Sequence, residues 1–151
     1  MNVVQKSLIA GSLAMAVSIV GYFEGRELIG YADPVGIPTI CYGHTATAKV
    51  GDTKSPEECE RLLQQDLGIA LNAVDHALPN LTAQTRAALG SFTYNVGVGA
   101  FNGSTLLRKA KSGDLIGACN ELTRWVYAGG RKLSGLVNRR AAERELCLAG
   151  L

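Results

Sequence analysis

The pattern of apolar and polar positions divides the chain into an uncharged N-terminal segment, a short β-rich segment and a series of helices. Residues 8–23 carry no charge and predict a first helix ending near 27–30. From 31 to 44, glycine and proline punctuate short β-branched runs, as is typical of a small antiparallel sheet. Residues 46–54 are polar and predict a loop.

A long helix is expected over residues 56–78. Ser55, Pro56 and Glu58 match a capping box, with the serine as N-cap, the proline at the first helical position and the glutamate at the third. Pro79 should stop the helix. Its apolar residues follow helical spacing, and they are Cys59, Leu62, Leu63, Leu67, Leu71 and Val74.

The C-terminal half predicts further helices. Thr82 caps one that runs to about Asn95 and is broken by glycines at 97 and 99. Others follow near 104–112, 114–125 and 135–149, with Gly113 and the Gly129-Gly130 pair as stops. We therefore expect an α+β fold, with a small sheet lobe, a larger helical lobe and a cleft between them. The first helix should return to the helical lobe and cover its core.

The composition fits one globular domain of 151 residues, 47% hydrophobic and 19% charged. A net charge of +2 without a basic run argues against nucleic acid but suits a polyanionic wall polymer. With two histidines and no C-x-x-C spacing, we expect neither a metal nor a cofactor. Cys41, Cys59, Cys119 and Cys147 would form disulfides, in one of three arrangements, if the protein is exported; the alternative is four reduced thiols in a cytosolic core.

Three interpretations compete for the uncharged segment 8–23. As a helix its sixteen residues span about 24 Å, short of the hydrocarbon core of about 30 Å, and glycines and serines dilute its apolar content. A cleaved signal peptide could use Ala14-Met15-Ala16, although the apolar core would then be too short. A buried core helix of a soluble protein is the second interpretation. We favour the third, a weak signal anchor that inserts and is later withdrawn.

Two acidic residues follow this segment at a spacing of nine. Glycoside hydrolysis needs one carboxylic acid to protonate the leaving oxygen and a second carboxylate to act from the other face of the sugar. Glu24 lies at the end of the first helix and Asp33 in a hairpin rich in proline and glycine, so both could face one groove. This pair alone is weak evidence for a glycosidase site, because most pairs of acidic residues at such a spacing are solvated surface charges.

The wider motif is specific. Glu24, Asp33 and Thr39 stand within Glu-Gly-x5-Tyr-x-Asp-x2-Gly-x2-Thr-Ile-x2-Gly-His, which resembles the phage-type lysozyme (endolysin) family. Further matching segments are 91–97, 101–106, 125–130 and 135–140, so the resemblance covers about 23–147. The apolar N-terminus resembles the signal-anchor-release subgroup of these endolysins.

The resemblance implies a lysozyme-like fold and hydrolysis of the β-1,4 bond between N-acetylmuramic acid and N-acetylglucosamine in peptidoglycan. Glu24 would be the general acid of an inverting enzyme. Asp33 would orient or deprotonate water, and the Thr39 hydroxyl would hold that water; the alternative is that Thr39 is simply a good strand residue.

Other residues receive supporting roles from the same resemblance. Arg139 would be a cation beside Glu24, or else belong to a solvated run with Arg140 and Arg144. His44 and Asp66 would form a structural ion pair between the hairpin and the connecting helix. The sugar cleft would be lined by three residues, of which the first could also be plain core: Tyr94, Asn95 and Ser104.

The expected organisation is an N-terminal segment over 1–23 and a catalytic domain over 24–151. The domain divides into a small lobe at about 31–55, the connecting helix at 56–78 and a helical lobe at 80–151 that includes the first helix. Disulfides within the lobes, 41–59 and 119–147, are favoured over bridges across the cleft. We expect a monomer that associates transiently with the host inner membrane through residues 8–23, with a cytoplasmic N-terminus and a periplasmic catalytic domain, before release to the periplasm.

Other classes of protein fit the sequence less well. A lytic transglycosylase acts on the same polymer but needs only the acid, so Asp33 and Thr39 argue against it. A membrane-anchored peptidoglycan-binding protein would need no catalytic pair. A membrane-permeabilising protein is disfavoured because the chain has one apolar segment and is otherwise typical of a globular domain.

Overall fold

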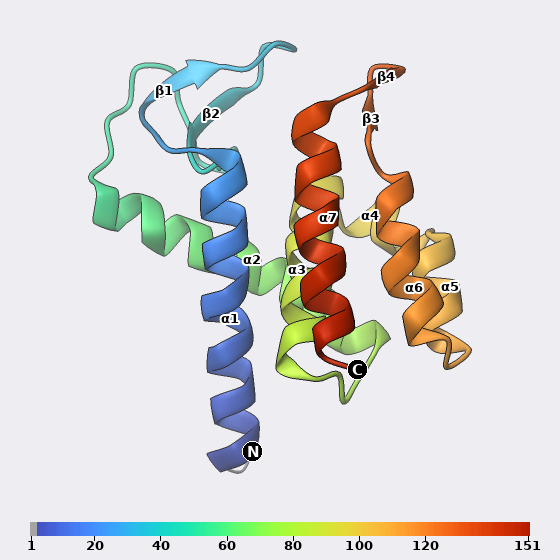
Figure 1. Ribbon diagram of the computed structural model, residues 1–151. Helices are drawn as coiled ribbons and strands as arrows, with labels where there is room; N and C mark the ends of the chain where they lie inside the picture. Colours follow the sequence, from blue (N-terminus) through green and yellow to red (C-terminus); the bar gives the residue numbers. More distant parts are fainter. Residues whose placement is uncertain (1–2) are drawn as a thin grey trace.

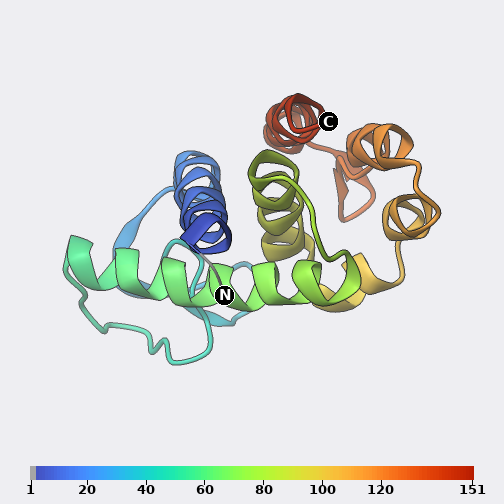
Figure 2. The ribbon, with the colours of Figure 1, turned by 90° about the horizontal axis from the view of Figure 1, so that it is seen from below.

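The computed structural model describes residues 3–151, with side chains described from residue 10 onward. Residues 1 and 2 of the expected N-terminal segment lie outside the described residues. A small sheet and a larger group of helices are joined by one long helix (Figure 1). That helix is α2 (Pro56–Ala77). In Figure 2 it runs across the lower part of the picture, and α1 (Val3–Glu24) and α3 (Ala83–Val96) stand side by side above it, seen nearly end-on. The expected α+β architecture is confirmed.

The small sheet consists of β1 (Glu27–Ala32) and β2 (Pro38–Cys41), paired antiparallel with Tyr31 opposite Thr39. The predicted end of the first helix near 27–30 and the start of the sheet at 31 are wrong. Gly25 adopts a left-handed φ of 68°, which ends the helix after Glu24 and lets the strand begin at residue 27. The small lobe therefore begins earlier than expected.

The capping box at the start of α2 is confirmed. The Ser55 hydroxyl accepts from the Glu58 N–H at 3.1 Å, and the Glu58 carboxylate accepts from the Ser55 N–H at 2.7 Å. This second bond lowers the pKa of Glu58 because it stabilises the ionised carboxylate. The helix ends at Ala77, one residue before the predicted boundary, and Leu78 is its C-cap.

The C-terminal half contains the predicted helices and two elements that were missed. Thr82 caps α3 as expected, and the later helices are α5 (Thr105–Lys111), α6 (Leu115–Glu121) with a 3₁₀ turn over Leu122–Arg124, and α7 (Ser134–Ala149). The missed elements are the short helix α4 (Val98–Asn102) and the hairpin of β3 (Tyr127–Ala128) and β4 (Arg131–Lys132). Gly97 (φ 93°) redirects the chain into α4 instead of ending helical structure. Gly129 and Gly130 both have positive φ and form the two-residue turn of the hairpin.

The first helix packs on the helical lobe, as predicted. Its buried stripe is Ser12, Ala16 and Val20, spaced four residues apart so that they share one face. Ala16 and Val20 pack with a set from α2 and α3, namely Leu63, Leu67 and Ala87. The Ser12 hydroxyl donates to the Ala83 carbonyl of α3 at 3.2 Å. Over residues 3–151, no helix has both the length and the apolar content that crossing a bilayer requires.

Both predicted disulfides are confirmed. Cys41–Cys59 joins β2 to α2, and Cys119–Cys147 joins α6 to α7. Cys119 and Cys147 belong to the main core of the helical lobe, together with large side chains from α3, α4, α5 and the 3₁₀ turn, namely Phe92, Phe101, Leu106 and Leu122. The first bridge ties the small sheet to the start of the connecting helix and the second lies inside the helical lobe, so neither bridge joins the two sides of the cleft.

The crossing of α2 and α3 depends on a glycine. A Cβ on Gly90 of α3 would lie 2.4 Å from Cδ2 and 3.1 Å from Cγ of buried Leu71 on α2, whereas a Cβ on Gly68 of α2 would meet nothing within 4 Å. We expect Gly90→Ala to lower the free energy of unfolding by about 1–3 kcal/mol through overpacking. Gly68→Ala, the matched control, should raise it by about 0.5–1 kcal/mol because it restricts the unfolded chain. Chemical denaturation measures both, and equal effects would contradict the close packing.

Candidate active site

Glu24 is the last residue of α1 and faces the helical lobe. Its Oε1 accepts a hydrogen bond from Arg139 Nη1 of α7 at 2.6 Å, and its side chain remains 25% exposed. Its other oxygen lies beside Gly43, where a Cβ would stand 3.6 Å from Glu24 Oε2 and 3.8 Å from the Tyr94 hydroxyl. A glycine at 43 therefore leaves room at the carboxylate. The predicted cation beside Glu24 is confirmed as a contact, and the alternative of a solvated Arg139 is wrong.

A cavity of about 420 Å³ opens at this carboxylate. Its walls come from the end of α1, the turn after β2, α2 and the C-terminal part of α3. Glu24 and Asp66 place carboxylates on it, and Tyr94 and Asn95 line the α3 side. Such a polar pocket between two lobes is a suitable site for a hydroxyl-rich ligand.

Tyr94 connects α3 to the small lobe. Its hydroxyl donates to the Tyr42 carbonyl at 2.5 Å. Burial, followed by the negative charges of Glu24 and Asp66, raises the pKa of Tyr94 above its ordinary value, so the phenol stays protonated and remains a donor at neutral pH. Asn95 accepts from Arg140 through its Oδ1. Both residues therefore lie at the predicted cleft, and each also makes a structural contact.

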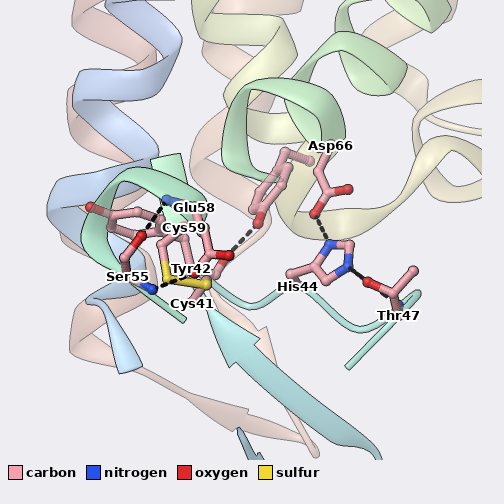
Figure 3. Close-up of a disulfide and its surroundings, with 9 residues drawn as sticks. Cys41, Tyr42, His44, Thr47, Ser55, Glu58, Cys59 and Asp66 are labelled. Carbon is pink, nitrogen blue, oxygen red and sulfur yellow. Dashed lines mark hydrogen bonds and ion pairs between the residues drawn. A yellow bond between two sulfur atoms is a disulfide. The ribbon is translucent and has the colours of Figure 1, made fainter. Parts of the chain in front are cut away.

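His44 links the turn after β2 to the connecting helix (Figure 3). Its Nδ1 lies 2.7 Å from Asp66 Oδ2, and the backbone N–H of Thr47 donates to its Nε2. Because Nε2 accepts, the proton on the Asp66 side belongs to Nδ1. The ring is buried and held at both nitrogens. The predicted contact between the hairpin and the connecting helix is confirmed.

Asp33 and Thr39 lie on the hairpin but not among the residues that line the cavity at Glu24. Asp33 Oδ1 accepts from the N–H groups of Val35 and Ile37 at 2.9 and 2.8 Å, which closes the turn between β1 and β2. The buried Thr39 hydroxyl donates to the Ile37 carbonyl at 3.0 Å. Both side chains are thus positioned by the hairpin itself.

Ser104 is placed differently from the expectation. It is the N-cap of α5, where its buried hydroxyl accepts from the Leu107 N–H and donates to the Phe101 carbonyl. It does not line the cavity at Glu24. Its hydrogen-bonding capacity serves the helix cap, which a serine before a helical run also predicts.

Sequence reasoning missed the charged groups behind Arg139. Glu143 and Arg140 of α7 are fully buried and contact each other, and Glu143 also accepts from Arg139 Nε at 3.1 Å and from the Ser91 hydroxyl at 2.7 Å. The spacings of three and four residues between these arginines and Glu143 were visible in the sequence as helical neighbours. Their burial was not visible there.

Comparison with known proteins matches residues 21–143 to the Phage lysozyme family model. A protein of bacteriophage PS119 named SAR-endolysin is 43% identical, with coverage of 99% of this chain and 94% of that protein. Among solved structures, the muramidase domain of SpmX from Asticaccaulis excentricus has a TM-score of 0.82 at 33% identity, covering 88% of this chain and 94% of that one. The endolysin of Escherichia coli O157:H7 phage FAHEc1 has a TM-score of 0.79 at 32% identity, covering 91% and 92%.

These matches agree with the fold and with the position of Glu24 at a polar cavity between a small sheet and a helical lobe. The predicted resemblance is therefore confirmed over most of the chain. This protein belongs to the phage lysozyme family of glycoside hydrolases.

Proposed function

We propose that this protein is an endolysin that hydrolyses the β-1,4 bond between N-acetylmuramic acid and N-acetylglucosamine and so lyses the host cell. The observation that carries the proposal is the Glu24 carboxyl group, which is partly exposed on a polar cavity and held by a buried arginine. A positioned carboxylic acid is the group that glycosidic bond cleavage needs at the leaving oxygen.

In this proposal Glu24 protonates the leaving oxygen, and the hairpin supplies the second carboxylate. Asp33 uses Oδ1 to close its own turn, so Oδ2 is the oxygen that would orient or deprotonate the attacking water. Thr39, opposite Tyr31 in the sheet, would hold that water through its hydroxyl. Attack by water on the face opposite the leaving group inverts the anomeric carbon.

Tyr94 and Asn95 would contact the glycan from the α3 side of the cavity, and Asp66 from the α2 side. Ser104 is left out of this binding surface because its hydroxyl is committed to the cap of α5. The enzyme acts as a monomer in this proposal, because the described chain contains the acid, the second carboxylate and the cavity.

Residues 8–23 would first anchor the chain in the host inner membrane, with the catalytic domain in the periplasm, and then be withdrawn. Relatives named SAR-endolysin support this order of events. Because Glu24 directly follows the segment, an inserted segment would hold the acid at the bilayer surface, away from Arg139. The anchored form would be inactive, since misplacement of a catalytic group by about 1 Å can cost 10²-fold in rate. Withdrawal lets Ser12, Ala16 and Val20 pack on the helical lobe and brings the acid into place.

Glu24→Gln tests the catalytic proposal, because the amide keeps the shape but cannot donate the proton. We expect its rate of peptidoglycan hydrolysis to fall by about 10²–10⁴-fold, the range typical of a lost general acid. Release of reducing ends from purified walls measures it. Glu27→Gln on exposed β1 is the matched control and should retain activity. Retained activity in Glu24→Gln, or products with anhydro ends in place of reducing ends, would contradict the proposed hydrolase.

The anchoring proposal is tested at positions that leave the packed face intact. Ser12→Leu is unsuitable because Ser12 is buried against α3, but Gly11 has open space around its Cβ and Ser18 is exposed. We expect Gly11→Leu with Ser18→Leu to increase the membrane-bound fraction and delay lysis, since each leucine favours insertion by about 0.5 kcal/mol at the helix centre. Membrane fractionation and a lysis time course measure this. Gly11→Ser with Ser18→Asn is the polar control. If the leucine variant were released from the membrane as readily as the unmodified chain, the anchoring proposal would be contradicted.

A further inference from the structure

Four charged side chains form a cluster that extends from Glu24 at the cavity to three buried side chains behind it. Two are carboxylates, Glu24 and Glu143, and two are guanidinium groups, Arg139 and Arg140. Glu143 has no exposed surface, and the side chains of Arg139 and Arg140 are 4% and 1% exposed. At such depth the charges are weakly screened, so each one affects the ionisation of the others.

Arg139 is shared between the two carboxylates. Its Nη1 donates to Glu24 at 2.6 Å, its Nε donates to Glu143 at 3.1 Å, and its Nη2 donates to the Ser91 carbonyl at 3.3 Å. The guanidinium is therefore fixed by α7 and α3 independently of Glu24.

Arg140 is held by the same glutamate on its other side. It contacts Glu143 Oε2, donates through Nε to the Trp125 carbonyl at 3.0 Å, and lies with its guanidinium carbon 5.0 Å from the Phe92 ring centroid. Burial lowers the pKa of Arg140 and Glu143 opposes that shift, but an arginine stays charged at neutral pH.

The charge count determines what Glu143 does. With Glu24 ionised, the four groups sum to zero; with Glu24 protonated, as a general acid must be, they sum to +1. Without the charge of Glu143, the sum is +1 with Glu24 ionised and +2 with Glu24 protonated. Protonation of Glu24 would then leave two uncompensated positive charges, at a larger electrostatic cost than when Glu143 is ionised. The other titratable groups facing Glu24 are Tyr94 of α3, which stays protonated, and Asp66 of α2, which is engaged by His44.

We infer that Glu143 is a positioning residue for the general acid: it holds Arg139 in place and offsets the positive charge of both arginines, which lowers the electrostatic cost of placing a proton on Glu24. This inference rests on the proposed role of Glu24. Glu143 does not touch the substrate, because it has no exposed surface.

The test is the pH dependence of wall hydrolysis by full-length released enzyme. In Glu143→Gln, which keeps the side-chain shape, the alkaline limb of the activity profile should move to lower pH by about one unit, as removal of a nearby buried charge predicts. Glu121→Gln is the matched control: Glu121 is also a buried, paired glutamate, with Lys109 at 2.6 Å, but it lies on α6 away from Glu24. The alkaline limb of the activity profile should not move in Glu121→Gln.

Two further variants separate charge from structure. Arg140→Gln should move the limb to higher pH, and Arg140→Gln with Glu143→Gln should return it toward the unmodified position. A uniform loss of activity at every pH, with the limb unchanged in Glu143→Gln, would overturn the inference and leave only a structural role. If thermal unfolding shows that Glu143→Gln does not fold, the other two variants test the inference. The alkaline limb should then move to higher pH in Arg140→Gln and return toward the unmodified position in the double variant.

A titration of the Glu24 side-chain carboxyl, followed by ¹³C NMR, measures the influence of Glu143 on Glu24 directly and needs no activity assay. Its midpoint should fall in Glu143→Gln and not in Glu121→Gln. If Glu24→Gln stays active while this midpoint still shifts, the proposed function fails and the electrostatic coupling stands. If Glu24→Gln is inactive and the midpoint does not shift, the coupling fails alone.

Discussion

The ion pair between Glu24 and Arg139 joins residues 115 positions apart, the last residue of α1 and a buried position in α7. The rest of the site depends on it because it fixes the side chain of Glu24, which is followed immediately by Gly25 and, two residues after that glycine, by the start of β1. Arg139 also binds Glu143 and the Ser91 carbonyl, and neither contact involves Glu24. The position of the Glu24 carboxylate therefore depends on the docking of α1 against the helical lobe.

Docking of α1 uses small side chains. Ser12 and Ala16 allow the helix to approach α3 closely, and the Ser12 hydroxyl is satisfied by the Ala83 carbonyl. The sequence of the helix is apolar overall and lacks the strong polar face that a surface helix normally shows. The same features that dilute the segment for a bilayer thus suit it for close packing on protein. In the proposed release, this helix would move from the bilayer to this packing position on the helical lobe.

The opposite wall of the cavity is held by contacts inside the small lobe and with α2. The Cys41–Cys59 disulfide joins β2 to α2, the buried His44 binds Asp66 of α2, and Tyr94 reaches across from α3 to the Tyr42 carbonyl. Neither disulfide joins the small sheet to the helical lobe. The two parts are connected by α2, by the main chain between α1 and β1, and by noncovalent contacts.

Features that depend on neighbouring residues were determined by the sequence alone. The capping box of Ser55 and Glu58, the caps at Thr82, the helices of the C-terminal half and the motif around Glu24 all follow from residues a few positions apart, whose hydrogen bonds close locally. The intralobe disulfides followed from assigning each cysteine to a lobe. Only the tertiary structure decided that Arg140 and Glu143 are buried beside Arg139 and that Ser104 serves a cap instead of the cleft. It also decided that Gly97 leads into a further helix and that the Gly129-Gly130 pair forms the turn of a hairpin. The reason is physical: burial and contacts between distant helices arise from packing the whole chain, and a pattern of neighbouring residues does not contain them.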